Sequence, residues 1–326
     1  MKILITGGAG FIGSHLSEAL LCQGYDIVTI DNFNDYYNPD IKRSNYEKVK
    51  AVAAANKNEY SLYYGDIRDK KVIHQIFEEH DIAGVIALAA NAGVRPSIED
   101  PTYYVDVNLM GLTNILESMR KKGCKSLVFA SSSSVYGNNK KVPFSEKDAV
   151  DNPISPYAAT KKAGELLCYT YHSLFHINVA CLRYFTVYGP RQRPDLAINK
   201  FTRLMLENKA IPMYGDGSTA RDYTFISDIV DGTIKALQYV MQDNTPIYDI
   251  FNLGGSHPIT LRNLIDVIGQ ATKKSPQIKQ LPMQPGDVNI TYSDFNHAKE
   301  VLGYNPQVKI EQGIKEFVKW YEHEQK

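Results

Sequence analysis

Short apolar segments alternate with longer segments of helical periodicity over residues 1–185 of the chain. This alternation is typical of a parallel sheet that is covered by helices on both faces, since each helix returns the chain to the same edge of the sheet. The expected strands are Lys2 to Ile5, Ile27 to Ile30, Leu62 to Tyr64, Val85 to Leu88, Ser126 to Phe129 and Val179 to Leu182. The expected helices are Phe11 to Cys22, Asp69 to Glu79, Thr102 to Lys121 and Pro156 to Phe175. The pattern therefore predicts an α/β fold of the Rossmann type, with a doubly wound parallel sheet.

Beyond Tyr184 the pattern changes, because prolines and glycine turns divide the chain into shorter units. These breaks are Pro190, Pro194, Pro212, Gly215-Asp216-Gly217, Pro276, Pro282 and Pro285. We expect residues 186–326 to form mainly a smaller, mixed α/β lobe that covers the first domain, with room for the chain to cross back between the two. Internal repeats and low-complexity segments are not evident in the sequence.

The composition excludes several classes of partner. The 326 residues include 36 basic and 36 acidic side chains, so no net charge attracts the chain to nucleic acid or to a membrane surface. An anionic ligand must then be held by local groups. The first residues enter an apolar strand without the pattern of a signal peptide, and no apolar run approaches the ~18 residues of a membrane-spanning helix.

The cysteines indicate neither a disulfide framework nor a metal site, since they are scattered and show no C-x-x-C spacing. We expect buried free thiols in a reducing cytoplasm. The four are Cys22, Cys124, Cys168 and Cys181.

A glycine-rich turn joins the first expected strand to the first expected helix. It contains G-x-G-x-x-G at Gly8, Gly10 and Gly13. Such glycines permit a tight turn and a close approach of backbone to a pyrophosphate, while the helix N-terminus supplies NH donors. The sequence predicts a dinucleotide site that includes Gly7, Gly10, Phe11, Ile12 and Gly13.

The ends of the following strands carry side chains that suit the adenosine half of a dinucleotide. Asp31 follows Gly13 by eighteen residues, where a carboxylate accepts from ribose hydroxyls and repels a 2′-phosphate. This favours NAD over NADP, although Arg43 is a cation that could lie near the same ribose. The other residues expected around the cofactor are Asn32, Asp66, Ile67, Leu88, Ala89 and Ala90, with Asp66 and Ile67 at the adenine.

A serine-rich strand end, Ser131 to Ser134, precedes Tyr157 and Lys161 at the start of a helix. Residues four apart share one helical face, so the ammonium can lower the pKa of the phenol, together with the positive charge of an oxidised nicotinamide. A phenol tuned in this way can act as a general base near neutral pH. We therefore expect Tyr157 and Lys161 to contact both the cofactor and the reacting atoms.

Together these motifs resemble the extended short-chain dehydrogenase/reductase family, and within it the UDP-glucuronate 4-epimerases, over essentially the whole chain. The resemblance implies a catalytic Ser132, with Tyr157 as the base, Lys161 beside it and Tyr184 in the cofactor site. Ala87 departs from the pattern, because many relatives have histidine there. The segments that carry the resemblance are Thr6 to Gly13, Asp31 to Tyr37, Ala92 to Arg95, Ser131 to Gly137, Tyr157 to Lys161, Arg183 to Pro190, Arg193 to Asp195, Arg221 to Tyr223 and Met283 to Val288.

The resemblance also implies a UDP-sugar substrate between the lobes. Its pyrophosphate is expected near Arg221, with either Arg95 or Arg193 as a second cation, since arginine can donate to two phosphate oxygens at once. Asp287 is the expected acceptor for the uridine ribose. The expected donors to the C6 carboxylate of the sugar are Ser133, Ser134 and Thr186.

The implied reaction is an internal redox cycle. Tyr157 takes the proton of the C4 hydroxyl while hydride moves from C4 to NAD, and hydride then returns to the opposite face of the 4-keto sugar. UDP-glucuronate and UDP-galacturonate are thereby interconverted. The resemblance also implies a homodimer formed through the helices of residues 102–121 and 156–175.

Three related activities and one non-catalytic function are the alternatives at this point. UDP-glucose 4-epimerase differs mainly at Ala92 to Arg95 and Tyr184 to Asp195. UDP-glucuronate decarboxylases carry Glu at the position of Ser134, and nucleotide-sugar 4,6-dehydratases carry Asp-Glu at Ser133 and Ser134. A non-catalytic NAD-binding scaffold is the alternative from another class, and it has no need of Ser132, Tyr157 and Lys161.

Overall fold

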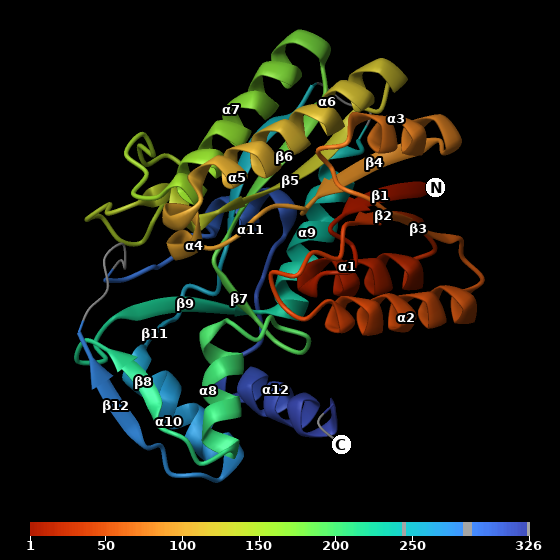
Figure 1. Cartoon of the computed structure of the whole chain (residues 1–326). Helices are drawn as coiled ribbons and strands as arrows, with labels where there is room; N and C mark the ends of the chain where they lie inside the picture. Colours follow the sequence, from red (N-terminus) through yellow and green to blue (C-terminus); the bar gives the residue numbers. More distant parts are fainter. Residues whose placement is uncertain (243–245, 283–288, 325–326) are drawn as a thin grey trace.

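A seven-stranded parallel sheet forms the centre of the protein (Figure 1). The computed structural model describes residues 1–242, 246–282 and 289–324. The order of the strands across the sheet is β10-β6-β5-β4-β1-β2-β3. The strands are β1 (Lys2–Thr6), β2 (Asp26–Asp31), β3 (Tyr60–Tyr64), β4 (Ile82–Ala87), β5 (Ser126–Ser132), β6 (Asn178–Tyr184) and β10 (Tyr248–Leu253).

The predicted Rossmann-type sheet is confirmed, and all six expected strands are present. The seventh strand, β10, comes from the second half of the chain and pairs with β6. β1 lies between β2 and β4, so the chain changes direction across the sheet at β1. In such folds a ligand binds beyond the carboxyl ends of the strands at this switch point.

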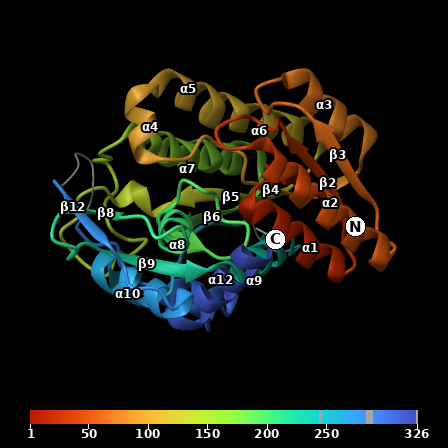
Figure 2. The same ribbon diagram turned by 60° about the horizontal axis from the view of Figure 1, so that its bottom comes forward.

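Helices cover both faces of the sheet (Figures 1 and 2). The helices α1 (Phe11–Cys22), α2 (Pro39–Asn56) and α9 (Ile226–Val240) lie on one face. The other face is covered by α3 (Lys70–Glu79), α5 (Pro101–Val105), the π-helical segment η1 (Asp106–Met110), α6 (Gly111–Lys122) and α7 (Pro156–Phe175). The expected helix over residues 102–121 is thus interrupted by η1. A short α4 (Val94–Glu99) and a 3₁₀ turn, η2 (Ser133–Tyr136), lie at the carboxyl edge of the sheet.

The helix α7 begins where the sequence predicts, because its N-terminus is capped. Ser155 accepts a hydrogen bond from the backbone NH of Ala158, and Pro156 occupies the first turn, where its missing NH costs nothing. This cap fixes the position of Tyr157 at the edge of the sheet.

The rest of the second half forms a smaller lobe beside the carboxyl edge of the main sheet (Figure 1). A three-stranded sheet combines β7 (Thr186–Tyr188), β9 (Ala220–Phe225) and β11 (Pro258–Thr260), and β8 (Ile211–Tyr214) pairs with β12 (Ile278–Leu281). Its helices are α8 (Ala197–Leu206), α10 (Leu261–Thr272) and α12 (Ile310–Glu324). α11 (Asn296–Leu302) packs instead against α9 and β10 of the main domain.

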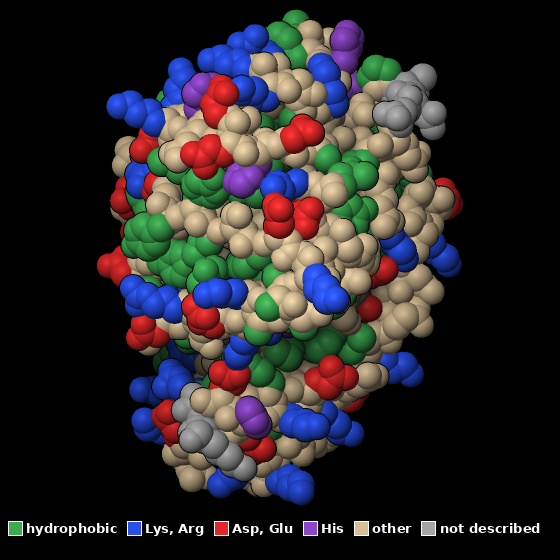
Figure 3. Space-filling model, turned by 90° about the vertical axis from the view of Figure 1, so that its right-hand side faces the viewer, with side chains coloured by type: hydrophobic (Ala, Val, Ile, Leu, Met, Phe, Trp, Pro, Cys, Tyr) green, Lys and Arg blue, Asp and Glu red, His purple; other side chains and the backbone are tan. Residues whose placement is uncertain are grey.

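The surface agrees with the balanced charge of the sequence, since basic and acidic side chains are interspersed on the face shown in Figure 3. Within the described part of the chain, no helix has both the length and the apolar character that a bilayer crossing requires. All four cysteines are free thiols, but the expectation that all are buried is wrong for Cys22, which is exposed at the end of α1.

Candidate active site

A cavity of about 390 Å³ runs along the carboxyl edge of the central sheet, at the switch point beside β1. Every residue that the sequence assigns to the cofactor lies in its wall, as do the three catalytic candidates. These residues are Gly7, Gly10, Phe11, Ile12, Gly13, Asp31, Asn32, Asp66, Ile67, Leu88, Ala89, Ala90, Ser132, Tyr157, Lys161 and Tyr184.

The glycine turn provides a close backbone approach that a side chain would block. A Cβ on Gly13 would lie 2.3 Å from the carbonyl oxygen of Gly7 and 2.8 Å from Cα of Gly8. Gly7 has a φ of +72°, a region that residues with side chains rarely adopt. The turn then leads directly into α1, whose first residues line the cavity. This cradle fits a dinucleotide pyrophosphate, because backbone NH groups and the helix dipole both favour an anion there.

At one end of the cavity, the Asp31 carboxylate is held by two donors. Its Oδ1 accepts from the backbone NH of Phe33 at 2.9 Å and from Nζ of Lys42 at 3.3 Å. Lys42 also donates to Asn34 and lines the cavity. The cation beside Asp31 is thus Lys42, whereas Arg43 pairs with Asp40 at the surface.

The sequence holds a signal for Lys42 that the analysis of motifs missed. The buried face of α2 consists of Lys42, Asn45, Val49 and Ala53, which are three or four residues apart. A lysine in such a stripe faces inward. The polar residues Lys42 and Asn45 on this face conceal the apolar periodicity of α2.

Asp66, which the sequence assigns to the adenine, lines the cavity and is fixed by Arg68. The guanidinium of Arg68 donates through Nε and Nη2 to the two carboxylate oxygens of Asp66, and Asn32 donates to Oδ2 at 3.0 Å. Burial raises the pKa of Asp66, but the hydrogen bonds from Arg68 and Asn32 outweigh it and leave the pKa below its usual value. The carboxylate is therefore an ionised acceptor at neutral pH.

The three catalytic candidates meet in one wall of the cavity. Ser132 ends β5, and its hydroxyl accepts from the backbone NH of Ser134 at 3.2 Å and lies near enough to the Tyr157 phenol to lower the pKa of that phenol. Lys161 lies one turn after Tyr157 on α7, where its Nζ donates to the carbonyl of Ala130 at 2.7 Å and lies 5.2 Å from the ring centre of Phe129. A hydroxyl, a phenol and an ammonium thus face the same space.

Burial dominates the pKa values of Tyr157 and Lys161 in the protein alone. Burial raises the pKa of Tyr157, and the nearby hydroxyl of Ser132 and the positive charge of Arg193 offset only part of that rise. Burial also lowers the pKa of Lys161 to about 8. In the protein alone, the phenol is therefore a weaker acid than ordinary tyrosine, and the positive charge of Arg193 is one of the influences that lower its pKa.

Arg193 lines the opposite end of the cavity from Asp66, among aromatic side chains. It donates to both carboxylate oxygens of Asp195, at 3.0 and 2.7 Å, and its guanidinium lies 4.9 Å from the ring centre of Tyr36. The hydroxyl of the neighbouring Tyr104 donates to the carbonyl of Ala92 at 3.2 Å, and the Tyr104 ring meets that of Tyr157 edge to face at 6.3 Å. The sequence predicted Arg193 as a site residue but did not predict the aromatic side chains around it.

Among the remaining substrate candidates in the described part of the chain, Thr186 alone lines the cavity. Ser133 and Ser134 begin the 3₁₀ turn directly after Ser132. Arg95 and Arg221 lie further out: Arg95 is 5.2 Å from the ring centre of Tyr214 on β8, and Arg221 is on β9. Asp287, with the whole segment of residues 283–288, lies outside the described residues.

Fold and site together define a dehydrogenase of the short-chain class, with a serine, tyrosine and lysine beside a dinucleotide cradle. The chain belongs to the family described as GDP-mannose 4,6 dehydratase, whose profile matches residues 4–317. The predicted relation to the extended short-chain nucleotide-sugar epimerases is confirmed by the relatives that follow.

A UDP-glucuronate 4-epimerase of Thermodesulfobacterium geofontis is 42% identical over 97% of this chain and 95% of its own. The crystal structure of UDP-glucuronic acid 4-epimerase from Bacillus cereus, in complex with UDP-glucuronic acid and NAD, superposes with a TM-score of 0.90 at 35% identity and covers 99% of both chains. UDP-glucose 4-epimerase of Thermotoga maritima, with UDP-glucose, has a TM-score of 0.87 at 32% identity and covers 100% of both chains.

Proposed function

We propose that this protein interconverts UDP-glucuronate and UDP-galacturonate by epimerisation at C4, with NAD as its catalytic cofactor. The observation that carries the proposal is the meeting of Ser132, Tyr157 and Lys161 in the wall of the cavity that also contains the glycine cradle. The similarity to UDP-glucuronate 4-epimerases over nearly the whole chain supports the choice of substrate.

The residues of the chain have separate tasks in this reaction. The Tyr157 phenolate takes the proton of the C4 hydroxyl and returns it after the sugar has turned, and Ser132 shares the hydrogen bond of that oxygen. Lys161 supplies positive charge beside the phenol and the cofactor. NAD, when bound, accepts hydride from C4, returns it to the other face, and adds the positive charge that lowers the pKa of Tyr157.

Two features of the site favour epimerisation over the related eliminations. Dehydratases of the family use an Asp-Glu pair at the positions of Ser133 and Ser134, and decarboxylases typically use Glu at the second. Serine at both positions supplies hydrogen-bond donors but no general acid–base pair. We propose that Ser133, Ser134 and Thr186 hold the C6 carboxylate, which keeps the C5–C6 bond out of line with the C4 carbonyl and so prevents loss of CO₂.

We expect Ser134→Ala and Thr186→Ala to increase the share of UDP-pentose by-product about tenfold, because each removes one hydrogen bond to a charged group. The by-product is measured by chromatography after complete turnover of UDP-glucuronate. Thr170→Ala is the control, since this hydroxyl donates to the carbonyl of Leu166 within α7. Unchanged product ratios in both site variants would overturn the assignment of the carboxylate donors.

The substrate itself is tested by product identity. Purified protein is given UDP-glucuronate, UDP-glucose and UDP-N-acetylglucosamine separately, and products are identified by proton NMR. We expect UDP-galacturonate, formed at least about tenfold faster than any product of the other two sugars. Preference for UDP-glucose would instead support a UDP-glucose 4-epimerase, and no turnover of any sugar would support a non-catalytic NAD-binding protein.

We also propose a cytoplasmic homodimer that serves polysaccharide synthesis. Large exposed apolar side chains support the dimer, since six of the eleven in the described residues lie on α4, α5, η1 and α7. They are Ile98, Val105, Met110, Leu166, Tyr169 and Leu174. An exposed apolar surface of this kind is typical of an interface, and α6 and α7 lie side by side in the outer layer (Figure 1).

The double variant Leu166→Asp/Leu174→Asp is expected to be monomeric, because two buried carboxylates in each protomer would face an apolar interface. Light scattering after size exclusion measures the mass. Val301→Asp on α11, also exposed, should leave the dimer intact. A parent protein that is monomeric, or a double variant that remains dimeric, would contradict this interface.

A further inference from the structure

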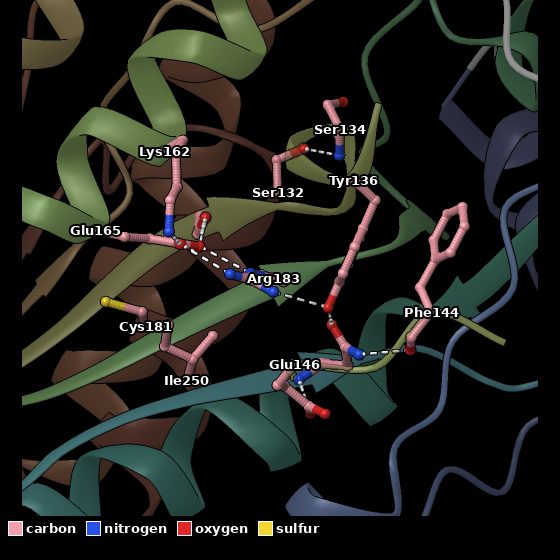
Figure 4. A network of polar contacts seen from close by, with 12 residues as sticks. Ser132, Ser134, Tyr136, Phe144, Glu146, Lys162, Glu165, Cys181, Arg183 and Ile250 are labelled. Atoms are coloured by element: carbon pink, nitrogen blue, oxygen red, sulfur yellow. Dashed lines mark hydrogen bonds and ion pairs between the residues drawn. The ribbon is translucent and has the colours of Figure 1, made fainter. Parts of the chain in front are cut away.

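A buried ion pair lies directly behind the catalytic wall (Figure 4). Glu165 on α7 is fully buried, and Arg183 on β6 is 1% exposed. The guanidinium donates to both carboxylate oxygens, from Nε to Oε1 and from Nη2 to Oε2, each at 2.9 Å. Lys162 lies 3.5 Å from Oε2. A buried ion pair adds little net stability compared with apolar side chains of the same size, so its presence here calls for another reason.

Glu165 belongs to a series of contacts between α7 and the end of β5. The helix residues of this series are four apart, so they share one face, and the strand residues are consecutive. Two of the contacts are hydrogen bonds, from Lys161 to the carbonyl of Ala130 and from the hydroxyl of Ser131 to Glu165, each at 2.7 Å. In the third, the Tyr157 phenol lies near the hydroxyl of Ser132. Glu165 therefore completes the attachment of the catalytic helix to the catalytic strand.

Arg183 extends the attachment to the turn after Ser132. Its Cα is the register partner of Ser131, and its Nη1 donates to the Tyr136 hydroxyl at 2.9 Å. The guanidinium also lies 4.9 Å from the centre of the Tyr136 ring. Tyr136 ends the turn η2, which begins with the proposed carboxylate donors Ser133 and Ser134.

Tyr136 is in turn fixed from the far side. Its hydroxyl donates to Oδ1 of Asn252 on β10 at 2.7 Å, and the Asn252 amide donates to the carbonyls of Phe144 and Asp294. Glu146 accepts from the backbone NH of Asn252. A continuous path of polar contacts thus connects α7, β6, the turn η2 and β10, and all its members except Glu146 and Asp294 are deeply buried.

We propose that Glu165 and Arg183 are positioning residues, whose ion pair fixes Ser132 and the turn of residues 133–136 relative to Tyr157. This inference rests on the proposed epimerase function. Proton transfer at C4 requires Ser132 and Tyr157, and restraint of the C6 carboxylate requires the turn of residues 133–136. The distance between these two groups of residues must stay fixed. The buried pair contacts Ser131, which precedes Ser132, and Tyr136, which ends the turn of Ser133 and Ser134. It thereby maintains that distance, and its charged hydrogen bonds make it stiff.

The test uses variants that leave the ion pair whole, because removing one charge would leave the other buried without a partner and unfold the protein. Ser131→Ala removes the contact between Glu165 and the catalytic strand. Tyr136→Phe removes the hydrogen bond between Arg183 and the turn and keeps the aromatic ring. Tyr171→Phe is the matched control. Tyr171 lies on α7, as Tyr157 does, and its hydroxyl donates to Glu117 on α6 at 2.7 Å, away from the cavity.

We expect the two site variants to change different quantities, kcat in one and the product ratio in the other. Ser131→Ala should lower kcat about tenfold with KM within about twofold of the parent, since small displacements of reacting groups cost up to about 10²-fold. Tyr136→Phe should raise the UDP-pentose share about fivefold, because the turn that bears Ser133 and Ser134 is then held less firmly. Thermal unfolding of each variant, and rates measured well below its midpoint, separate these effects from a loss of folded protein.

The outcomes distinguish this inference from the function on which it rests. If both variants keep the kcat and the product ratio of the parent, as Tyr171→Phe should, the ion pair has no positioning role. Equal losses in kcat with unchanged product ratio in both would also overturn it. A parent protein without turnover of UDP-glucuronate overturns the proposed function first, and this inference with it.

Discussion

Tyr157→Phe is expected to lower kcat for UDP-glucuronate about 10³-fold while UDP-sugar binding stays within about threefold of the parent. The change deletes one oxygen from the cavity wall and leaves the ring in edge-to-face contact with Tyr104. The proton of the C4 hydroxyl then has no acceptor of suitable pKa, because the Ser132 hydroxyl is a far weaker base than a phenolate. The loss therefore belongs to the chemical step and not to binding.

This prediction is checked by steady-state rates together with calorimetric binding of the UDP-sugar. Tyr171→Phe, the same chemical change on the same helix, should behave as the parent. Tyr157→Phe with more than about one tenth of the parental kcat would show that another group takes the proton.

The second large effect is expected at the glycine cradle. A Cβ at Gly13 would lie 2.3 Å from the Gly7 carbonyl oxygen and 2.8 Å from Gly8 Cα, closer than such atoms approach in proteins. Both neighbours are backbone, so the turn itself must move. We expect Gly13→Ala to weaken NAD binding about 100-fold and to destabilise the protein by about 1–3 kcal/mol, as overpacking commonly does.

NAD binding by calorimetry and the free energy of unfolding by urea titration check this prediction. Gly123→Ala is the control for a strained glycine: its φ of +74° makes a side chain costly, but the added Cβ meets open space at the end of α6. It should lose stability without losing NAD affinity. NAD affinity in Gly13→Ala equal to that of the parent would place the dinucleotide elsewhere.

The sequence predicted the parts of the fold that rest on local patterns. Buried strands read as apolar runs, as in β5, where every residue is buried, and α7 carries its own cap at Ser155. α2 was missed because its buried face includes Lys42 and Asn45, which conceal the apolar stripe. β10 was missed as part of the main sheet, because nothing local determines which edge a late strand joins.

The sequence likewise predicted only those features of the candidate site that rest on local motifs. The residues that the motifs assign to the cofactor and to catalysis line one cavity, because each motif lies at the end of a strand and parallel strands end at one edge. The pairing of Lys42 with Asp31, and the surround of Arg193, depend on contacts between distant segments. The titration of Tyr157 depends on burial, which a helical spacing of four residues does not reveal.

The central claim is that hydrogen leaves C4 of the sugar and returns to the same carbon within one protein. The most direct test is turnover of UDP-glucuronate with deuterium at C4, in ordinary water, followed by mass spectrometry and NMR of the product. The account predicts UDP-galacturonate with the deuterium retained at C4. Loss of the label to solvent would contradict it, because the inversion would then proceed by proton exchange with water.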